Sequence, residues 1–470
     1  MADKIRHQIA INLRKPGWRC APAGRSAGRS DQRFPAYLRI TRIHCAEQMA
    51  TWACAILRTQ VTPTSQRLEQ RGKTMAAYDP FDAVSTSYLR AGLRLGQEID
   101  GLVDSYYGPE ELRQDAAQLG VERALDELDT EIARLTPDAR RDYLTAQSRA
   151  LRAIADLHSG KSLPYRDEIE ATFGVRPELV DEAQFETALE ELDRLLPGDG
   201  DLYTRRQDHR AQLVIEPSAV LPLTQTLMSD LRERAESVVQ LPAGEAAHIE
   251  IVHDQPWSGY NWYLGNLRSR IEINADLPIH ANSLPDLIAH EIYCGHHTEH
   301  SVKEQRFVRE QGWGEAAITL LTSPQAVVSE GIATMAFETL VPEEDEAAWL
   351  RRHCYAAAGI DLDVELELAI QRAARPLRYV SGNAALLIHD EGQPLDAARE
   401  YITRYGLRSP AEAEQTVRFI TTPILRCYTF TYTEGYDRVS AFLARSGDPH
   451  RALGKLITGH WSPERLTNDH

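Results

Sequence analysis

A chain of 470 residues with a net charge of −17 is long enough for two or three domains or for one large enzyme. Its acidity argues against nucleic acid as a partner, because phosphate binding requires a basic surface. Beyond residue 74 the chain has three cysteines, Cys294, Cys354 and Cys427, which are too few and too scattered for a disulfide framework and favour a reducing, cytoplasmic setting.

The charge is divided unevenly along the chain. Residues 1–74 contain 14 basic and 4 acidic residues, which leaves 38 basic and 65 acidic residues in 75–470. The most apolar stretch of this leader, Met49 to Leu57, is too short to cross a membrane and has no small-residue cleavage site. We therefore expect no membrane partner. We expect residues 1–74 to be disordered or to lie upstream of a natural start at Met75, with a transit-like targeting segment as the alternative.

Beyond this leader the hydrophobic period is that of helices. Turn-forming clusters at 107–109, 196–200 and 241–244 separate the helical runs. The sequence predicts a mainly α fold, with an N-terminal helical lobe at 75–240 and a catalytic lobe at 241–470. Apolar residues recur at three- and four-residue spacing in Ala83 to Val103, Val121 to Leu135, Arg140 to Leu157, Phe185 to Leu195 and Ala219 to Val239.

Two short alternating segments interrupt the helices and predict a small β-sheet. One is His248 to Val252; the other, Arg268 to Asn274, alternates more clearly, with Arg270, Glu272 and Asn274 on one face. The second segment directly precedes a histidine-rich stretch, so it could be an exposed edge that pairs with an extended peptide. An ordinary small sheet with a polar outer face is equally consistent with the pattern.

The segment from His290 to His297 reads His-Glu-Ile-Tyr-Cys-Gly-His-His. In the usual H-E-x-x-H form, two histidines four residues apart bind zinc from one helix face, and the glutamate activates water. Here Cys294 stands at i+4, and the next histidines stand six and seven residues after His290. On an unbroken helix these lie about 9 and 10.5 Å further along the axis. Zn–N bonds of about 2.1 Å cannot span that separation.

Gly295 offers a solution, because glycine tolerates a bulge or an end to regular helix geometry. Such a break would let the following histidine take the i+4 role. Upstream, the run from Ser283 to Asp286 has the pattern of a helix start, with Ser as N-cap and Pro in the first turn.

A zinc site built on two histidines requires a third protein ligand, and a carboxylate from a neighbouring helix is a common choice. Ser323-Pro324 predicts the start of a second helix that contains Glu330. Glu330 is the best candidate, because the small Gly331 and Ala333 beside it would permit close helix packing.

Together the two motifs resemble the bacterial zinc-peptidase-like family called domain of unknown function 885. The likeness rests on His-Glu-x-x-x-Gly-His-His at 290–297, on Glu-Gly-x-Ala at 330–333, and more weakly on 106–109 and 432–435. This chain would be a divergent member, since the family usually has Pro at the position of Cys294 and Trp at that of Ile332. The resemblance implies a mainly helical metallopeptidase scaffold, distantly like carboxypeptidase Taq, the oligopeptidases and dipeptidyl peptidase III.

The resemblance also implies roles for individual residues. It makes His290, His296 and Glu330 the zinc ligands and Glu291 the general base, and it leaves the substrate unnamed. Tyr432, which precedes Gly435 in a Tyr-x-x-Gly pattern similar to the family's, would be the phenol that reaches the oxyanion. Asn274 is similar to the family's strand ending and would position the substrate.

Several residues near the motif keep alternative roles. Cys294 could itself be a thiolate ligand, although a buried helical cysteine is more often a small hydrophobe. His297 is the rival of His296 for the second histidine position. Glu299 and His300 are expected on a solvated continuation of the helix, with support of the metal ligands as the alternative.

Tyrosines at 428, 432 and 436 recur every four residues after Pro423, a spacing that is also typical of core packing. Among them Tyr428 is the second candidate for the site, and His389 is a further candidate proton donor. The sequence therefore predicts a cytoplasmic, zinc-dependent peptidase of short peptides, in which Glu291 takes a proton from the attacking water. The alternatives are a zinc hydrolase of a non-peptide amide or ester, and a non-catalytic helical scaffold that retains a metal site.

Overall fold

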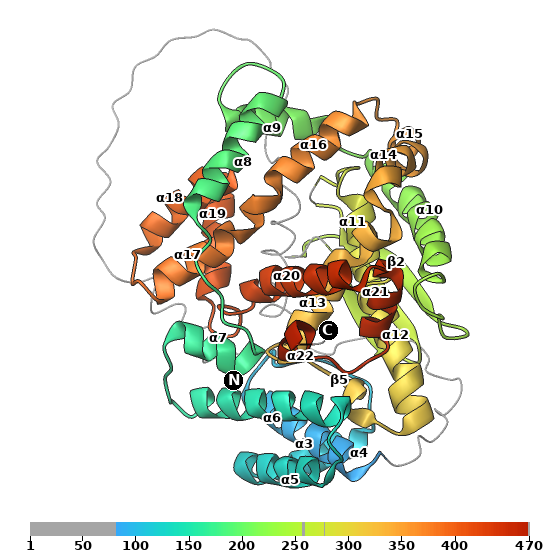
Figure 1. Cartoon of the computed structure of the whole chain (residues 1–470), viewed down its shortest axis with the longest axis vertical. Helices are drawn as coiled ribbons and strands as arrows, with labels where there is room; N and C mark the ends of the chain where they lie inside the picture. Colours follow the sequence, from blue (N-terminus) through green and yellow to red (C-terminus); the bar gives the residue numbers. More distant parts are fainter. Residues whose placement is uncertain (1–80, 256–258, 277, 469–470) are drawn as a thin grey trace, which may run out of the picture. The chain divides into compact units, whose positions relative to one another are not determined.

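The computed structural model describes residues 81–255, 259–276 and 278–468, and the predictions for residues 1–74 and for Met75 fall outside these ranges. Within them the chain is mainly helical with a small mixed sheet, as predicted (Figure 1). Among the described helices, none combines the length and the apolar character that crossing a membrane requires.

The first part of the chain is almost entirely helical, and all five predicted helices are present. The first of them ends at Glu98 rather than at Val103, because a turn with Gly101 at φ +82° carries the chain into a strand. The helices are α3 (Ala83–Glu98), α4 (Glu110–Ala116), α5 (Val121–Arg134), α6 (Ala139–His158), α7 (Tyr165–Phe173), α8 (Glu182–Leu195), α9 (Leu202–Ala211) and α10 (Pro217–Ala235).

The described strands form two small sheets. The three-stranded sheet has the order β2-β4-β3, with β2 (Ala246–Val252) parallel to β4 (Arg268–Asn274) and β3 (Gly259–Gly265) antiparallel to it. Of the two alternatives for 268–274, the exposed edge is wrong, because the unpredicted β3 pairs with the second side of this strand. A two-stranded sheet joins β1 (Val103–Tyr106) to β5 (Ile318–Leu320).

The second half of the chain contains the remaining helices, and α11 to α13 include the two sequence motifs. They are α11 (Leu284–Glu291), α12 (His296–Lys303), η1 (Glu304–Arg309), η2 (Gly314–Ala317), α13 (Pro324–Leu340), α14 (Glu343–Leu350), η3 (Arg351–Tyr355), α15 (Ala356–Ala358), α16 (Val364–Ala374), η4 (Arg375–Tyr379), α17 (Val380–His389), α18 (Leu395–Gly406), α19 (Pro410–Thr421), α20 (Thr429–Ser446), α21 (Pro449–Ile457) and α22 (Pro463–Asn468).

Helix α13 is buried and crosses α20 at backbone contact (Figure 1). A Cβ added to Gly331 would lie 2.4 Å from the Gly435 carbonyl oxygen, and one added to Gly435 would lie 2.4 Å from the Val327 carbonyl oxygen. The small residue beside Glu330 therefore permits close helix packing, as predicted. The crossing brings the start of α20 next to the carboxylate of Glu330.

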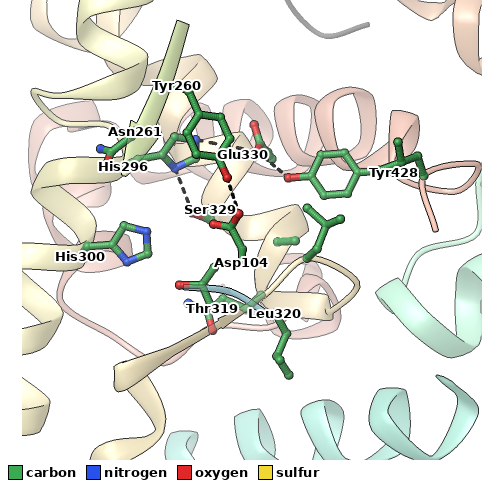
Figure 2. Close-up of a pocket in the computed structure, with 14 residues that line it drawn as sticks. Asp104, Tyr260, Asn261, His296, His300, Thr319, Leu320, Ser329, Glu330 and Tyr428 are labelled. Carbon is green, nitrogen blue, oxygen red and sulfur yellow. Dashed lines mark hydrogen bonds and ion pairs between the residues drawn. The ribbon is translucent and has the colours of Figure 1, made fainter. Parts of the chain in front are cut away.

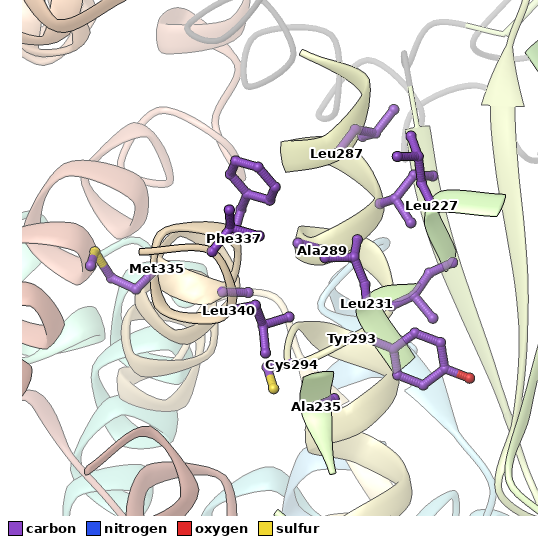
Figure 3. Packing of buried hydrophobic residues seen from close by; sticks show 14 of the residues in the cluster. Leu227, Leu231, Ala235, Leu287, Ala289, Tyr293, Cys294, Met335, Phe337 and Leu340 are labelled. Carbon is purple, nitrogen blue, oxygen red and sulfur yellow. The ribbon is translucent and has the colours of Figure 1, made fainter. Parts of the chain in front are cut away.

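The core consists of three large clusters of buried apolar side chains. Figure 3 shows part of one cluster, where Leu231 of α10, Ala289 of α11 and Leu340 of α13 pack together. Each of the three clusters contains residues from both sides of residue 240, so the two predicted lobes share their cores. All the described residues belong to one compact unit.

Candidate metal centre

The two helices that carry the motifs begin where the sequence indicates, but only one is capped as expected. Ser323 accepts a hydrogen bond from the amide of Ala326 at the start of α13. Ser283 occupies the N-cap position of α11, yet its hydroxyl donates to the His280 carbonyl 3.2 Å away instead of accepting from the helix. Ser283 is therefore the N-cap residue of α11, as predicted, but its side chain does not cap the helix.

The histidine-rich segment is broken, as predicted. Helix α11 ends at Glu291 and α12 begins at His296, and the amide of Thr298 donates across the break to the carbonyl of Ile292. A Cβ on Gly295 would lie 1.8 Å from the carbonyl oxygen of His290. Only glycine fits there without moving the backbone, so Gly295 permits the break.

Because of this break, His290 at the end of α11, His296 at the start of α12 and Glu330 on α13 converge. Their ligand atoms all lie within 4.8 Å of one another. Nε2 of His290 is 3.5 Å from Glu330 Oε2, and Nε2 of His296 is 3.8 Å from Glu330 Oε1. Tetrahedral ligands about 2.1 Å from a zinc ion are about 3.4 Å apart. Two of the separations are close to this value, and the three groups could together hold a metal ion.

Burial sets the protonation of this group. Burial lowers the pKa of His290 and of His296 to about 4, so both rings are neutral near pH 7 and can each offer a lone pair to a metal. Burial also raises the pKa of Glu330, against the opposing influence of His296. A bound cation would favour the charged form of this carboxylate.

Glu291 lies beside the ligands and is fully buried. Neither of its carboxylate oxygens has a hydrogen bond with any residue in the described ranges. Burial raises its pKa well above the usual value, and the negative charge of Glu330 adds to the rise. A buried carboxylate without a protein partner is costly, and such groups are found preferentially at functional sites.

A chain of polar contacts leads away from the His296 ring and begins with Ser329 (Figure 2). The Ser329 hydroxyl lies 3.3 Å from His296 Nδ1 and donates to Glu299, whose other oxygen accepts from Lys303 at 2.5 Å. Glu299 is buried, and although burial opposes ionisation, Lys303 lowers its pKa to about 2. The prediction that this stretch is solvated was wrong for Glu299, which is buried against Ser329 of α13, whereas His300 is half-buried and lines a cavity.

Neither alternative ligand joins the cluster. Cys294 is fully buried among apolar side chains (Figure 3), and burial raises the pKa of its thiol to about 12. Both ring nitrogens of His297 are engaged elsewhere, Nδ1 with Ser269 at 2.8 Å and Nε2 with Glu245 at 2.9 Å. The geometry therefore favours His296 as the second histidine.

Two of the three C-terminal tyrosines approach the carboxylates. The Tyr428 hydroxyl donates to Glu330 Oε1 at 2.8 Å. Tyr432 is buried with its ring 5.6 Å from that of Tyr428, and burial together with the charges of Glu330 and Glu291 raises its pKa. Tyr436 is partly buried at the edge of the core instead, under the Arg378 guanidinium.

The structure does not bring the other two candidates into the site. The amide of Asn274 donates to the Gln255 carbonyl and accepts from the amide of Asp276, so it holds a turn at the end of β4. His389 contacts the Ile420 carbonyl through Nε2 at 2.7 Å. Neither residue lines the cavity described next, and neither do His290, Glu291 and Tyr432, which lie behind its wall beside Glu330.

A cavity with an empty volume of about 730 Å³, including its open mouth, reaches two of the ligands (Figure 2). Sequence reasoning missed much of its wall, in part because five of the lining residues come from β1, β3 and β5, which carry no motif. For β3 a signal existed, since 259–265 places three aromatic residues between two glycines. The lining residues are Asp104, Tyr260, Asn261, His296, His300, Thr319, Leu320, Leu321, Gln325, Ala326, Ser329, Glu330, Leu425 and Tyr428.

No protein-family model matches this sequence, and comparison with curated proteins found no match. Among solved structures, a putative lipoprotein from Colwellia psychrerythraea is similar over 82% of this chain and 68% of its own length. The sequence identity is 15% and the TM-score is 0.46. A likeness this distant gives no information about what this chain binds or does.

Proposed function

We propose that this protein is a zinc-dependent peptidase of short peptides, in which His290, His296 and Glu330 hold the metal and Glu291 is the general base. One observation supports this best: two neutral histidines and a carboxylate converge beside a second buried carboxylate that has no hydrogen bond in the described part of the chain. A purely structural metal site requires ligands only, so the unbonded Glu291 favours catalysis over a scaffold.

When bound, zinc would supply Lewis acidity toward the substrate carbonyl and the attacking water. Glu291 takes the proton from that water and passes it to the leaving amine. The Tyr428 hydroxyl donates to Glu330 and so fixes the carboxylate that holds the metal. The charges of Glu330 and Glu291 raise the pKa of Tyr432, so its hydroxyl lies near both carboxylates. We assign Tyr432 as the phenol that donates to the oxyanion.

The first test is metal content. Purified protein should hold about one zinc per chain, because three protein ligands leave one position for water or substrate. The substitutions His290→Ala, His296→Ala and Glu330→Ala should each weaken zinc binding strongly. His248→Ala is the matched control, since this histidine on β2 is exposed. Full zinc in His296→Ala, with loss of zinc in Cys294→Ser or His297→Ala, would contradict the ligand assignment.

The second test separates catalysis from metal binding. Glu291→Gln keeps the shape of the side chain but cannot accept a proton, so it should retain zinc while hydrolysis falls by about 10²-fold or more. Turnover of a peptide library by wild type and variant at equal zinc content measures the effect. Glu250→Gln, on the exposed side of β2, serves as control. Equal turnover would remove Glu291 from the mechanism, and no turnover of any peptide or ester by zinc-loaded wild type would favour the scaffold.

A further inference from the structure

Asp104 is an acidic residue in the cavity wall that the proposed reaction does not use. It belongs to β1 and lines the same cavity as His296 and Glu330 (Figure 2). The Tyr260 hydroxyl donates to its Oδ1 in a close hydrogen bond, which leaves Oδ2 for a ligand. Asp104 is half-buried, so the charge on it is only partly screened by water.

Three of the four hydroxyl groups in this wall donate to carboxylates of the protein rather than to the cavity. Tyr260 donates to Asp104, Tyr428 to Glu330 and Ser329 to Glu299, whereas Thr319 accepts from Ser105. The described residues that line the cavity include neither lysine nor arginine. The wall therefore offers carboxylate acceptors and has no lysine or arginine donor.

Asn261 adds another acceptor. Its Nδ2 donates to the backbone carbonyl of Glu291 at 2.7 Å, and because a carbonyl only accepts, this contact fixes the amide orientation. Oδ1 of Asn261 is buried and receives a hydrogen bond from no described residue. This acceptor calls for a ligand that donates a hydrogen bond.

The acidic groups of the wall point to the same kind of ligand. The described residues that line the cavity include two carboxylates, those of Asp104 and Glu330, and neither lysine nor arginine. A ligand with a positive charge suits such a wall, whereas a terminal carboxylate would add a further acidic group to it.

We propose that the cavity selects peptides by their free N-terminal ammonium group, which Asp104 binds. Resting on the proposed function, this makes the protein an aminopeptidase type of enzyme that cleaves near the free amino end. An ammonium has three donors and no acceptor, which matches the wall. Leu320, Leu321 and Leu425 supply an apolar surface in the same cavity, so the preferred first side chain is apolar.

A binding experiment tests this without turnover. Zinc-supplemented Glu291→Gln protein is titrated by calorimetry with leucinamide and with N-acetyl-leucinamide, which lacks the charge. Leucinamide should bind at least about tenfold more tightly, the effect of one charge-assisted hydrogen bond. Adding Asp104→Asn should remove most of this preference at equal zinc content, whereas adding Asp115→Asn, an exposed residue of α4, should leave it unchanged.

Equal affinity for the pair, no binding of either compound, or a preference that survives Asp104→Asn would overturn the proposal. The last outcome would assign the amine to the metal instead. If thermal melting shows that Asp104→Asn does not fold, Tyr260→Phe replaces it. That variant keeps the charge and must keep the preference, and loss of the preference there would contradict the assignment to Asp104.

A turnover experiment separates this proposal from the proposed function. Wild-type protein is given a leucine-initiated tripeptide in free and in N-acetylated form. Cleavage of the free form only supports both proposals. Equal cleavage of both forms overturns the role of Asp104 and leaves the peptidase standing. If neither form is cleaved while leucinamide still binds through Asp104, the amine site stands and the peptidase does not.

Discussion

Replacing Gly295 with alanine tests whether the break between α11 and α12 makes this motif a metal site. The added Cβ would lie 1.8 Å from the His290 carbonyl oxygen and 2.5 Å from that of Ala289, and real Cβ contacts are essentially never shorter than 3.0 Å. Both opposing atoms are backbone, so no side chain can swing aside. The backbone of His290, which is a proposed ligand, would have to move by more than 1 Å.

A metal site does not tolerate such a shift, because ligand distances hold to within about 0.2 Å. We expect Gly295→Ala to lower zinc affinity by more than about tenfold and to destabilise the metal-free protein by about 1–3 kcal/mol or more, as overpacking does. Zinc titration against a competing chelator and urea unfolding measure the two effects. Gly120→Ala, where an added Cβ meets open space, is the control. Unchanged zinc affinity in Gly295→Ala would refute the reasoning.

Two further predictions concern the groups around the site. Ser329→Ala removes the hydroxyl beside His296 Nδ1, so zinc affinity should fall by about 10- to 100-fold with the fold intact; unchanged affinity would contradict the role of Ser329. Glu315 is buried, yet Arg140 and His460 hold its pKa well below the ordinary 4.5. Glu315→Gln should cost about 3 kcal/mol at pH 7, and because a lowered pKa stabilises only above its ordinary value, urea unfolding should show this difference shrinking below pH 4.5; a constant difference would refute it.

Much of the helical fold could be predicted, because helices of ten or more residues repeat their apolar pattern several times. The expected runs correspond to α3, α5, α6, α8 and α10 with ends shifted by a few residues. The four-residue β1 shows no such repetition and was not predicted; the helix predicted before it ran on to Val103, the first residue of this strand. Strand β3 was also missed, and its pairing makes β4 a central strand, which decides between the two alternatives for 268–274.

The metal ligands could be predicted because the chemistry of two short motifs is local. What surrounds them could not, because it depends on which elements pack together. The sequence of α12 does not show that Glu299 packs against α13, so the burial of Glu299 was not predicted. Asp104 lies on a strand far from either motif in the sequence, and only the pairing of β1 with β5 places it in the cavity wall. The role expected for Asn274 depended on the same unknown packing.

Compared with H-E-x-x-H, this motif has two more residues between its histidines, and a second helix, α12, begins at the second histidine. This helix supports the proposed ligand His296. Helix α12 starts at His296, and the positive end of its dipole disfavours a protonated imidazole there, in the same direction as burial. Glu299 and Lys303, three and seven residues later, fall on the same face as His296. Glu299, one turn after His296, accepts a hydrogen bond from Ser329. Lys303, one turn further on, is the cation that balances the charge of Glu299. The break thus places a neutral ligand, its hydrogen-bonded support and the counter-charge on a single short helix.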